Sequence, residues 1–258
     1  TANTTASYNI AIGDSAMGSN TTGTNNIAIG QDALSANTDT NRNVAIGIEA
    51  MKVSTGSENV ALGYNALKAN TTGNRNVAVG DVALDANTTA TDCTAVGQGA
   101  LGANTTGIRN TAIGQGAMIL NTTGADNVAV GQAALDANTT GSSSVAVGFG
   151  ALSAATTGGF NTAVGYNALD ACTTGTTNNA LGTNALGAVT TGEQNSAMGI
   201  NAGGSITTAD NNVAIGHAAG NDALTTITTS NNIVLGNNST SVFETKVSLT
   251  VGSDERDK

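Results

Sequence analysis

Residues 76–92, NVAVGDVALDANTTATD, contain the unit that is repeated along this chain of 258 residues. In the first part of the unit, Ala, a large aliphatic residue and Gly follow one another, and this core recurs along the whole chain. The closing glycines are Gly13, Gly30, Gly47, Gly63, Gly80, Gly97, Gly114, Gly131, Gly148, Gly165, Gly182, Gly199, Gly216 and Gly236. Their spacing is seventeen residues, except for one step of sixteen and a last step of twenty. A fixed period of this length predicts a solenoid in which each unit forms one coil.

The residues that lead to each Gly are expected to form a short strand. The residue before Gly is Ile, Val or Leu in every unit except at Met198, and the residue before that is Ala except at Val234. Successive strand residues point to opposite faces. We expect the large aliphatic residues inside the coil and the Ala row outside, where a close neighbour leaves no room for a larger side chain. Replacing Ala129 with Leu is then expected to block self-association.

A second apolar pair, such as Ala83 and Leu84, follows each Gly by three and four residues. We expect it to form a second short strand whose Leu meets the strand aliphatic inside the coil. The sequence Asn-Thr-Thr-Gly then closes the unit, as at residues 104–107, and both Asn and Gly favour turns. The predicted fold is an all-β parallel solenoid of about fourteen coils, with two short strands in each coil.

The composition fits a thin, repeated core. The chain has no Pro and no Trp, only three Phe and three Tyr, and 34 Gly, yet 39% of its residues are hydrophobic. Pro would remove hydrogen bonds from a continuous ladder. The net charge is −10, and the charged residues are scattered along the chain without the basic patch of a nucleic-acid-binding protein. No apolar run is long enough for membrane insertion. Because the chain begins with Thr1, we read it as a segment of a longer protein.

The sequence predicts no metal site, cofactor or disulfide. Cys93 and Cys172 lie between four and five coils apart, on the order of 20 Å at one strand spacing per coil, which is too far for a disulfide. His217 is the only histidine, whereas zinc usually needs three or four ligands. The calcium-binding pattern Gly-Gly-x-Gly-x-Asp of other β-rolls is missing.

The unit NVAIG-xx-AL-x-ANTTG, which covers residues 9–236, resembles the head repeats of trimeric autotransporter adhesins. It also resembles the repeat arrays of bacteriophage tail fibres. In both groups the resemblance implies a homotrimer of left-handed parallel β-rolls that serves adhesion. On this basis we divide the chain into a repeat shaft (1–236), a terminal strand segment that caps it (237–252) and a short C-terminal stub (253–258).

The stub, Ser-Asp-Glu-Arg-Asp-Lys, resembles the first residues of the endosialidase-type intramolecular chaperone domain of phage tail fibres and tailspikes. That resemblance implies self-cleavage between Gly252 and Ser253, with Ser253 as the nucleophile and Lys258 as its base. A Lys acts as a base only when burial lowers its pKa, and the intermediate needs an oxyanion hole. Six residues supply neither, so no enzyme activity is expected of this chain.

The predicted function is that of a tail-fibre segment in a virion, which attaches the phage to a glycan or an outer-membrane component of the host. Four aromatic residues are candidate exposed contacts with that receptor: Tyr64, Phe149, Phe160 and Tyr166. The alternative is the head of a bacterial surface adhesin, in which a coiled-coil stalk and a membrane anchor, instead of the chaperone domain, would follow Lys258. A less favoured alternative is an ice-binding solenoid. Adjacent Thr in a strand would point in opposite directions, which argues against a flat Thr face.

Overall fold

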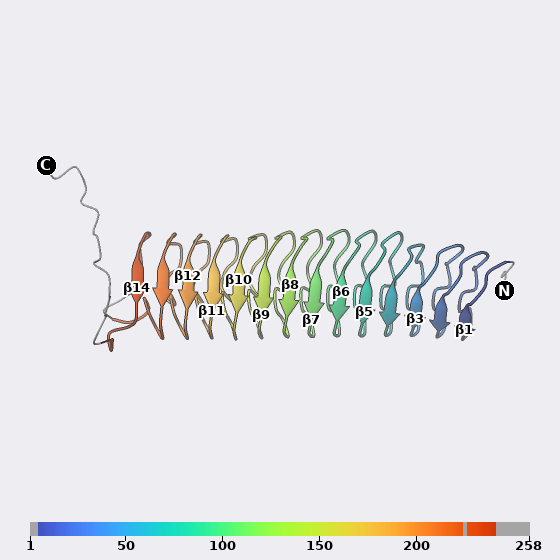
Figure 1. The fold of residues 1–258 in the computed structure, drawn as a ribbon, viewed down its shortest axis with the longest axis horizontal. Helices are drawn as coiled ribbons and strands as arrows, with labels where there is room; N and C mark the ends of the chain where they lie inside the picture. The colour runs from blue at the N-terminus through green and yellow to red at the C-terminus, as the bar shows by residue number, and fades with distance from the viewer. Residues whose placement is uncertain (1–4, 224–225, 241–258) are drawn as a thin grey trace, which may run out of the picture.

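The computed structural model describes residues 5–223 and 226–240. Within these ranges the chain winds into a straight rod whose strands form one parallel sheet in chain order (Figure 1). This confirms the predicted solenoid. The strands are β1 (Ile10–Ile12), β2 (Ile27–Ile29), β3 (Val44–Ile46), β4 (Val60–Leu62), β5 (Val77–Val79), β6 (Thr94–Val96), β7 (Thr111–Ile113), β8 (Val128–Val130), β9 (Val145–Val147), β10 (Thr162–Val164), β11 (Asn179–Leu181), β12 (Ser196–Met198), β13 (Val213–Ile215) and β14 (Ile233–Leu235).

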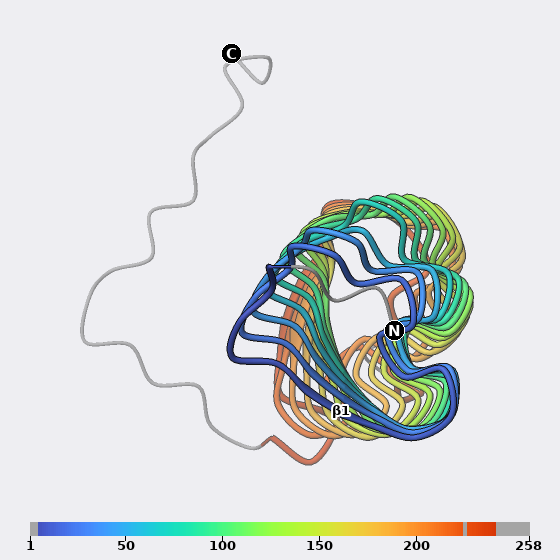
Figure 2. The ribbon, with the colours of Figure 1, turned by 90° about the vertical axis from the view of Figure 1, so that its right-hand side faces the viewer.

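The strands stack in strict register, so equivalent residues of successive coils form columns along the rod. Ala78 of β5, for example, pairs with Ala61 of β4 and Ala95 of β6. The coil of sixteen residues keeps this register because its missing residue falls in the turn after Thr55. Viewed along the axis, the coils share a similar outline, and each is turned slightly from the one before (Figure 2). Each coil therefore contacts only the coil before it and the coil after it, as in other solenoids.

Each coil contains one strand, so the prediction of two strands per coil is wrong. The segment with the second apolar pair is a stack of turns, in which Val82 and Leu84 both have a φ of 50°. Positive φ values cost about 1–2 kcal/mol for residues other than Gly. Hydrogen bonds to both neighbouring coils offset this cost: the Leu84 N–H donates to the Ala100 carbonyl (3.0 Å), and the Val82 N–H donates to the Tyr64 carbonyl (2.9 Å).

The interior of the coil is lined by the strand Ala and by the Ala-Leu pair opposite. Ala129 and Ala134 are fully buried, and Leu135 is 1% exposed. The residues on either side of the strand Ala point outward, so the predicted orientation of the strands is reversed. A coil this thin is filled by one Leu packed against the small Ala side chains of the strand. As a result, replacing Ala129 with Leu would overpack the core rather than act on an outer surface.

Two columns of buried Asn run along the rod, although the sequence predicts only turn residues for one of them. Asn161 shows the role of the column that precedes the strands. Its Nδ2 donates to the Gly175 carbonyl (2.8 Å) across its own coil, and its Oδ1 accepts from the Asn178 N–H of the next coil (2.9 Å). Buried polar groups have to be paired in this way. The members of this column are Asn26, Asn43, Asn59, Asn76, Asn110, Asn127, Asn161, Asn178, Asn195 and Asn212.

The second Asn column, which begins the Asn-Thr-Thr turn, ends partway along the rod. Asn138 donates to Asn121 Oδ1 (2.8 Å), but its own Oδ1 has no hydrogen-bond partner because Ala155 occupies the next position. Beyond Ala155 the column continues with Cys172 and then with larger aliphatic residues. The core of the C-terminal coils is therefore more apolar than that of the N-terminal coils.

Ile206 lies in the C-terminal continuation of the second Asn column, and its side chain occupies space that a Leu fills in the earlier coils. Gly203 stands where Leu152 stands in the coil of Ala155, and a Cβ on Gly203 would lie 2.6 Å from Leu186 Cδ2 and 3.3 Å from Ile206 Cδ1. Gly203→Leu and Ile206→Ala are each expected to lower the free energy of unfolding by about 2–4 kcal/mol. The double variant recreates the Leu152–Ala155 arrangement. Its loss of unfolding free energy is therefore expected to be about 1–3 kcal/mol smaller than the sum of the losses of the two single variants. Urea denaturation of the four proteins measures this coupling, and strict additivity would contradict it.

The two Thr of each turn both lie on the outside of the rod, contrary to the alternation expected for a strand. Thr88 is partly exposed and Thr89 is exposed, whereas the flanking Asn87 and Ala90 are buried. The segment is a turn, so neighbouring side chains need not alternate. Thr88 Oγ1 donates to the Thr105 carbonyl (3.0 Å), and equivalent bonds repeat from coil to coil. The first Thr column therefore uses its hydroxyl groups to join the coils.

Candidate interaction surface

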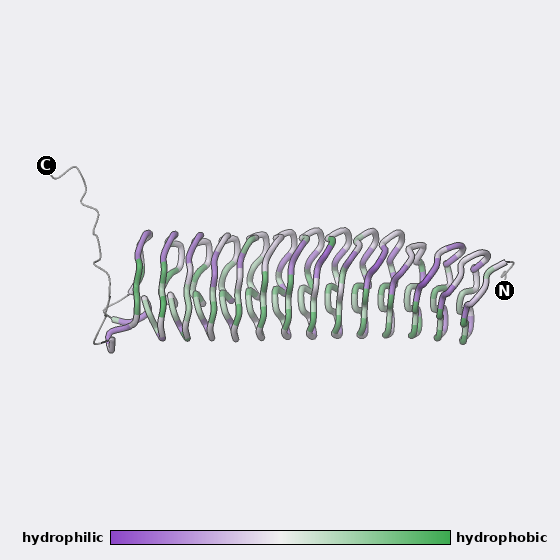
Figure 3. The backbone as a smooth tube through the Cα atoms, in the orientation of Figure 1, coloured by the Kyte–Doolittle hydropathy of each residue, from purple (hydrophilic) through white to green (hydrophobic). Residues whose placement is uncertain are grey.

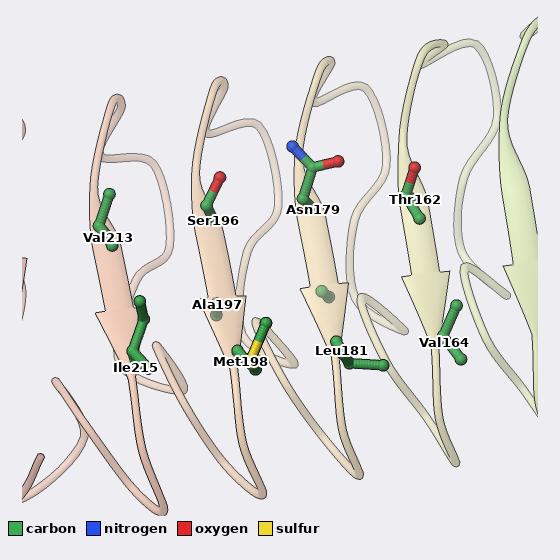
Figure 4. A pocket seen from close by; sticks show the side chains of 10 residues that line it. Thr162, Val164, Asn179, Leu181, Ser196, Ala197, Met198, Val213 and Ile215 are labelled. Carbon is green, nitrogen blue, oxygen red and sulfur yellow. The ribbon is translucent and has the colours of Figure 1, made fainter. Parts of the chain in front are cut away.

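The first and third residues of every strand form a largely apolar face on the outside of the rod, which we call the outer strip. The apolar segments recur at the same level in successive coils (Figure 3). In the close-up of Figure 4, the side chains of Leu181, Met198 and Ile215 project from the near side of the sheet, and Ala197 lies behind its strand. No residue of the outer strip in β1–β14 carries a charge.

The outer strip is unusually long for an exposed apolar surface. Met198 is 52% exposed, Leu181 is 47% exposed, and the other aliphatic side chains of the strip are at least partly exposed. Fourteen strands at one strand spacing per coil give a length of roughly 65 Å. With a width of about 10 Å the strip covers several hundred Å², which is as large as the largest patch of a typical monomer. Surfaces of this size and continuity mark interaction sites.

A column of alternating charges borders the strip at the start of the strands. Arg75 forms a two-pronged ion pair with Asp92, at 2.6 Å from Nε and 2.9 Å from Nη2, and Arg109 pairs with Asp126 in the same way. The Arg75 hydrogen bond lowers the pKa of the Asp92 carboxyl. Arg42 and Glu58 pair in the coils before. The sign of the charge thus alternates over six successive coils.

Polar and aromatic side chains border the strip at the other end of the strands. Gln98, Gln115 and Gln132 form a ladder of amide hydrogen bonds there, at 3.3 Å and 2.8 Å. In the next two coils of the same column, Phe149 and Tyr166 stack with their ring centroids 5.4 Å apart. An apolar centre between polar borders is the usual composition of a protein–protein interface.

The outer strip changes character near its C-terminal end. The first strand position is polar at Thr162, Asn179 and Ser196, next to the aliphatic Leu181 and Met198. A shallow groove of about 300 Å³ opens between these side chains over β10–β13 (Figure 4). The groove lies where three successive first positions are polar, whereas Val or Ile holds this position in most other coils.

The four aromatic residues predicted as receptor contacts are all exposed, as expected. Tyr64 and Tyr166 are each 52% exposed, Phe149 is 47% exposed and Phe160 is 66% exposed. They do not converge on one site, because Phe160 lies in the column of alternating charges and the other three follow the repeat glycines. The structure brings together only Phe149 and Tyr166.

The ionisable residues do not form a reactive centre within the described ranges. Cys93 and Cys172 are both buried and unpaired, and burial raises the pKa of the Cys172 thiol to about 11. A thiol with this pKa is inert as a nucleophile at neutral pH. His217 is exposed, and the described residues contain no cluster of three metal-ligating side chains.

The predicted cleavage site lies outside the described residues, as do Ser253 and Lys258 and most of the terminal strand segment 237–252. In the part of the chain that is described, no helix has the length and apolar character needed to cross a bilayer. The structure thus shows a β-solenoid with one repeat unit in each coil. Among its surfaces, the outer strip is the best suited to binding a partner. No family model, curated protein or solved structure matches this chain significantly.

Proposed function

We propose that this chain is a structural and receptor-binding segment of a bacteriophage tail fibre, which attaches the virion to the surface of its host as a homotrimer. The outer strip is the observation that carries the proposal. A rod that exposes an uncharged and largely aliphatic face along fourteen strands is expected to have a partner of similar length.

A second copy of the same chain is the partner that matches this face. The strip repeats once per coil, at about 4.8 Å, over its whole length. Only a surface with the same axial period meets it rung by rung, and another copy of the solenoid has that period by construction. Closed symmetry is the common form of such assemblies. The resemblance of the repeat to adhesin heads and tail fibres implies three copies around a common axis, which would bury all three strips.

The oligomer is tested by placing a charge on the strip. Val130, the third residue of β8, points outward and is partly exposed. Val130→Asp is expected to convert the protein from three times the mass of the 25.1 kDa chain to a monomer, because an unpaired buried carboxylate costs several kcal/mol at each contact. Sedimentation velocity measures the change. Ser143→Asp, on an exposed turn just before β9, is the matched control and is expected to keep the native mass.

Circular dichroism distinguishes loss of assembly from loss of fold, since a folded monomer keeps its β spectrum. A Val130→Asp protein that stays oligomeric would show that the strip is not the contact. A native protein that sediments as a monomer would contradict the proposed assembly directly.

The attachment function is tested with purified lipopolysaccharides and capsular glycans from a panel of bacteria. The assembled rod is expected to bind at least one of them saturably. The Val130→Asp monomer is expected to bind that glycan at least about a hundredfold more weakly, because it loses the gain from multivalency. Equal binding by both forms would argue against a fibre that works through several copies.

A further inference from the structure

Five residues interrupt the otherwise aliphatic outer strip, and all of them occupy the first strand position. Thr94 and Thr111 form a block of two polar residues in β6 and β7. Thr162, Asn179 and Ser196 form a block of three in β10–β12. Val128 and Val145 separate the two blocks, and the third strand position stays apolar in every coil.

A strip of identical rungs would assemble ambiguously. If every first position were Val or Ile, displacing one copy along the axis by a whole coil would again place aliphatic rungs opposite aliphatic rungs. Only the end coils would lose their contacts. A uniform repeat therefore stabilises close packing of the copies, but it determines their axial position relative to one another only weakly.

We propose that the five polar residues fix the axial register of the copies in the assembled fibre. The inference rests on the proposed self-association through the outer strip. It assigns to these residues the role that a single buried Asn has in a coiled coil, where it selects register at a cost in stability.

The arrangement of the two blocks makes the in-register position distinct. In register, each polar rung meets the same polar rung of its neighbours. A displacement by one coil places Val77 opposite Thr94 and Val128 opposite Thr111, and further mismatches occur at both ends of the longer block. Because the blocks differ in length, no displacement by a few coils restores the match. A hydroxyl or amide group that faces Val in a closed interface loses its hydrogen bonds.

The groove over β10–β13 is consistent with this role. Asn179 is exposed and lines this groove, and the side chains around it leave a space of about 300 Å³. An amide offers both donors and acceptors, and a hydroxyl offers both as well. The Asn179 and Ser196 side chains stand at the edge of this groove, and those of neighbouring copies would be able to bond one another there when the copies are in register.

The test measures displaced copies by disulfide trapping. Cys93→Asn and Cys172→Ala first remove the native thiols, using residue types found elsewhere in the same columns. One chain then carries Val44→Cys in β3, and a second, tagged chain carries Val77→Cys in β5. These positions lie two coils apart, about 10 Å along the axis. A disulfide requires Cα atoms within about 7 Å, so a mixed disulfide between the two chains reports displaced copies.

The two chains are unfolded, mixed, refolded and oxidised, with the native strip and with a strip carrying Thr94→Val, Thr111→Val, Thr162→Val, Asn179→Val and Ser196→Val. The native strip is expected to give disulfides only between like chains. The aliphatic strip is expected to raise the fraction of mixed disulfides about tenfold or more, which corresponds to at least about 1.4 kcal/mol in register preference. The matched control places five Thr→Val changes in the exposed turn column, at Thr89, Thr106, Thr157, Thr174 and Thr191, and is expected to behave like the native strip.

Each result decides one claim. An unchanged fraction of mixed disulfides with the aliphatic strip, or mixed disulfides with the native strip, overturns the register role while leaving the assembly intact. The absence of disulfides between like chains in an oligomer overturns the contact through the strip, and thus the proposed function. If the aliphatic strip aggregates, Val128→Thr with Val145→Thr replaces it. This variant joins the two blocks into one polar run and is also expected to increase the mixed product, and no increase would again contradict the register role.

Discussion

Replacing Gly131 with Ala is expected to lower the free energy of unfolding by about 3–5 kcal/mol, a large effect for a single added methyl group. Gly131 closes the β8 unit with a φ of 137°, in a region that is nearly exclusive to glycine. A Cβ at this position would lie 2.4 Å from the Gly148 carbonyl oxygen of the next coil. Neither the backbone of this coil nor that of its neighbour is free to move, because both belong to the continuous ladder.

Gly116→Ala is the matched control for this substitution. Gly116 also has a positive φ, of 66°, but a Cβ there would meet no atom within 4 Å. Its replacement is expected to cost only the price of the left-handed conformation, about 1–2 kcal/mol. Thermal and urea denaturation of both variants measure the difference. Equal losses would mean that close stacking of the coils at the glycine column does not limit stability.

Replacing Asn161 with Ala is expected to cost about 2–5 kcal/mol, because it leaves buried backbone groups without partners. The Asn178 N–H loses its acceptor, and the Gly175 carbonyl keeps only the weak S–H donor of Cys172 at 3.6 Å. Asn127→Ala in the same column is expected to cost less, since the Gly141 carbonyl also accepts from Asn138 Nδ2 (3.0 Å). Denaturation of the two variants under the same conditions tests this order, and the reverse order would contradict the role given to the Asn column.

Asn161→Asp adds a pH dependence with a predictable sign. A carboxylate at this buried position would face the Gly175 carbonyl, so its pKa in the folded protein is expected to rise above the ordinary value of about 3.9. A raised carboxyl pKa destabilises the fold at neutral pH, and the loss is recovered as the pH falls below the raised pKa. The difference in unfolding free energy between Asn161→Asp and the native protein is therefore expected to be smaller at pH 4 than at pH 7. A difference that grows toward pH 4 would contradict it.

The sequence predicted the period, the parallel sheet and the position of the glycine column, because all three follow from strict repetition. A residue type that is kept in stacked units faces the same constraint in each unit. The coil of sixteen residues fits the same repetition, since its missing residue falls in the turn after Thr55, where the register of Val44 and Val60 is not affected.

The side of the strand that faces inward was predicted wrongly, although the sequence contained the necessary signal. The prediction relied on the size of the side chains and placed the large ones in the core. In a strand of three residues, however, the first and third residues share a face. Thr162, Asn179 and Ser196 stand at the first position, and a core would not accept three such residues. The third position is apolar in every coil but shares the face of the first, whereas the central position, which is Ala or Val in every coil, faces the other way.

The turn conformation of the second segment and the burial of the Asn columns were not predictable from the sequence. A pair such as Ala83 and Leu84 is compatible with either a strand or a turn, and only the φ values separate them. Gly99 and Gly116, at positions that elsewhere hold larger residues, hinted at positive φ. The Asn residues recur in most units, but a polar residue in a turn and one in a buried ladder look alike in a sequence. The receptor contacts and the cleavage site depend on regions and partners beyond the folded coils.

The alternating charges beside the strip bear on how such a rod could change its length. Because each coil touches only its neighbours, loss or duplication of a whole unit by recombination between repeats leaves the remaining coils properly stacked. Losing the unit that contains Asp92, however, would bring Arg75 against Arg109, whereas losing two units would leave a cation beside an anion. Each exposed ion pair contributes at most about 1 kcal/mol to stability, so the loss or gain of an odd number of units is tolerated. Over many generations, growth and shrinkage in pairs of units would nevertheless be favoured in this part of the rod.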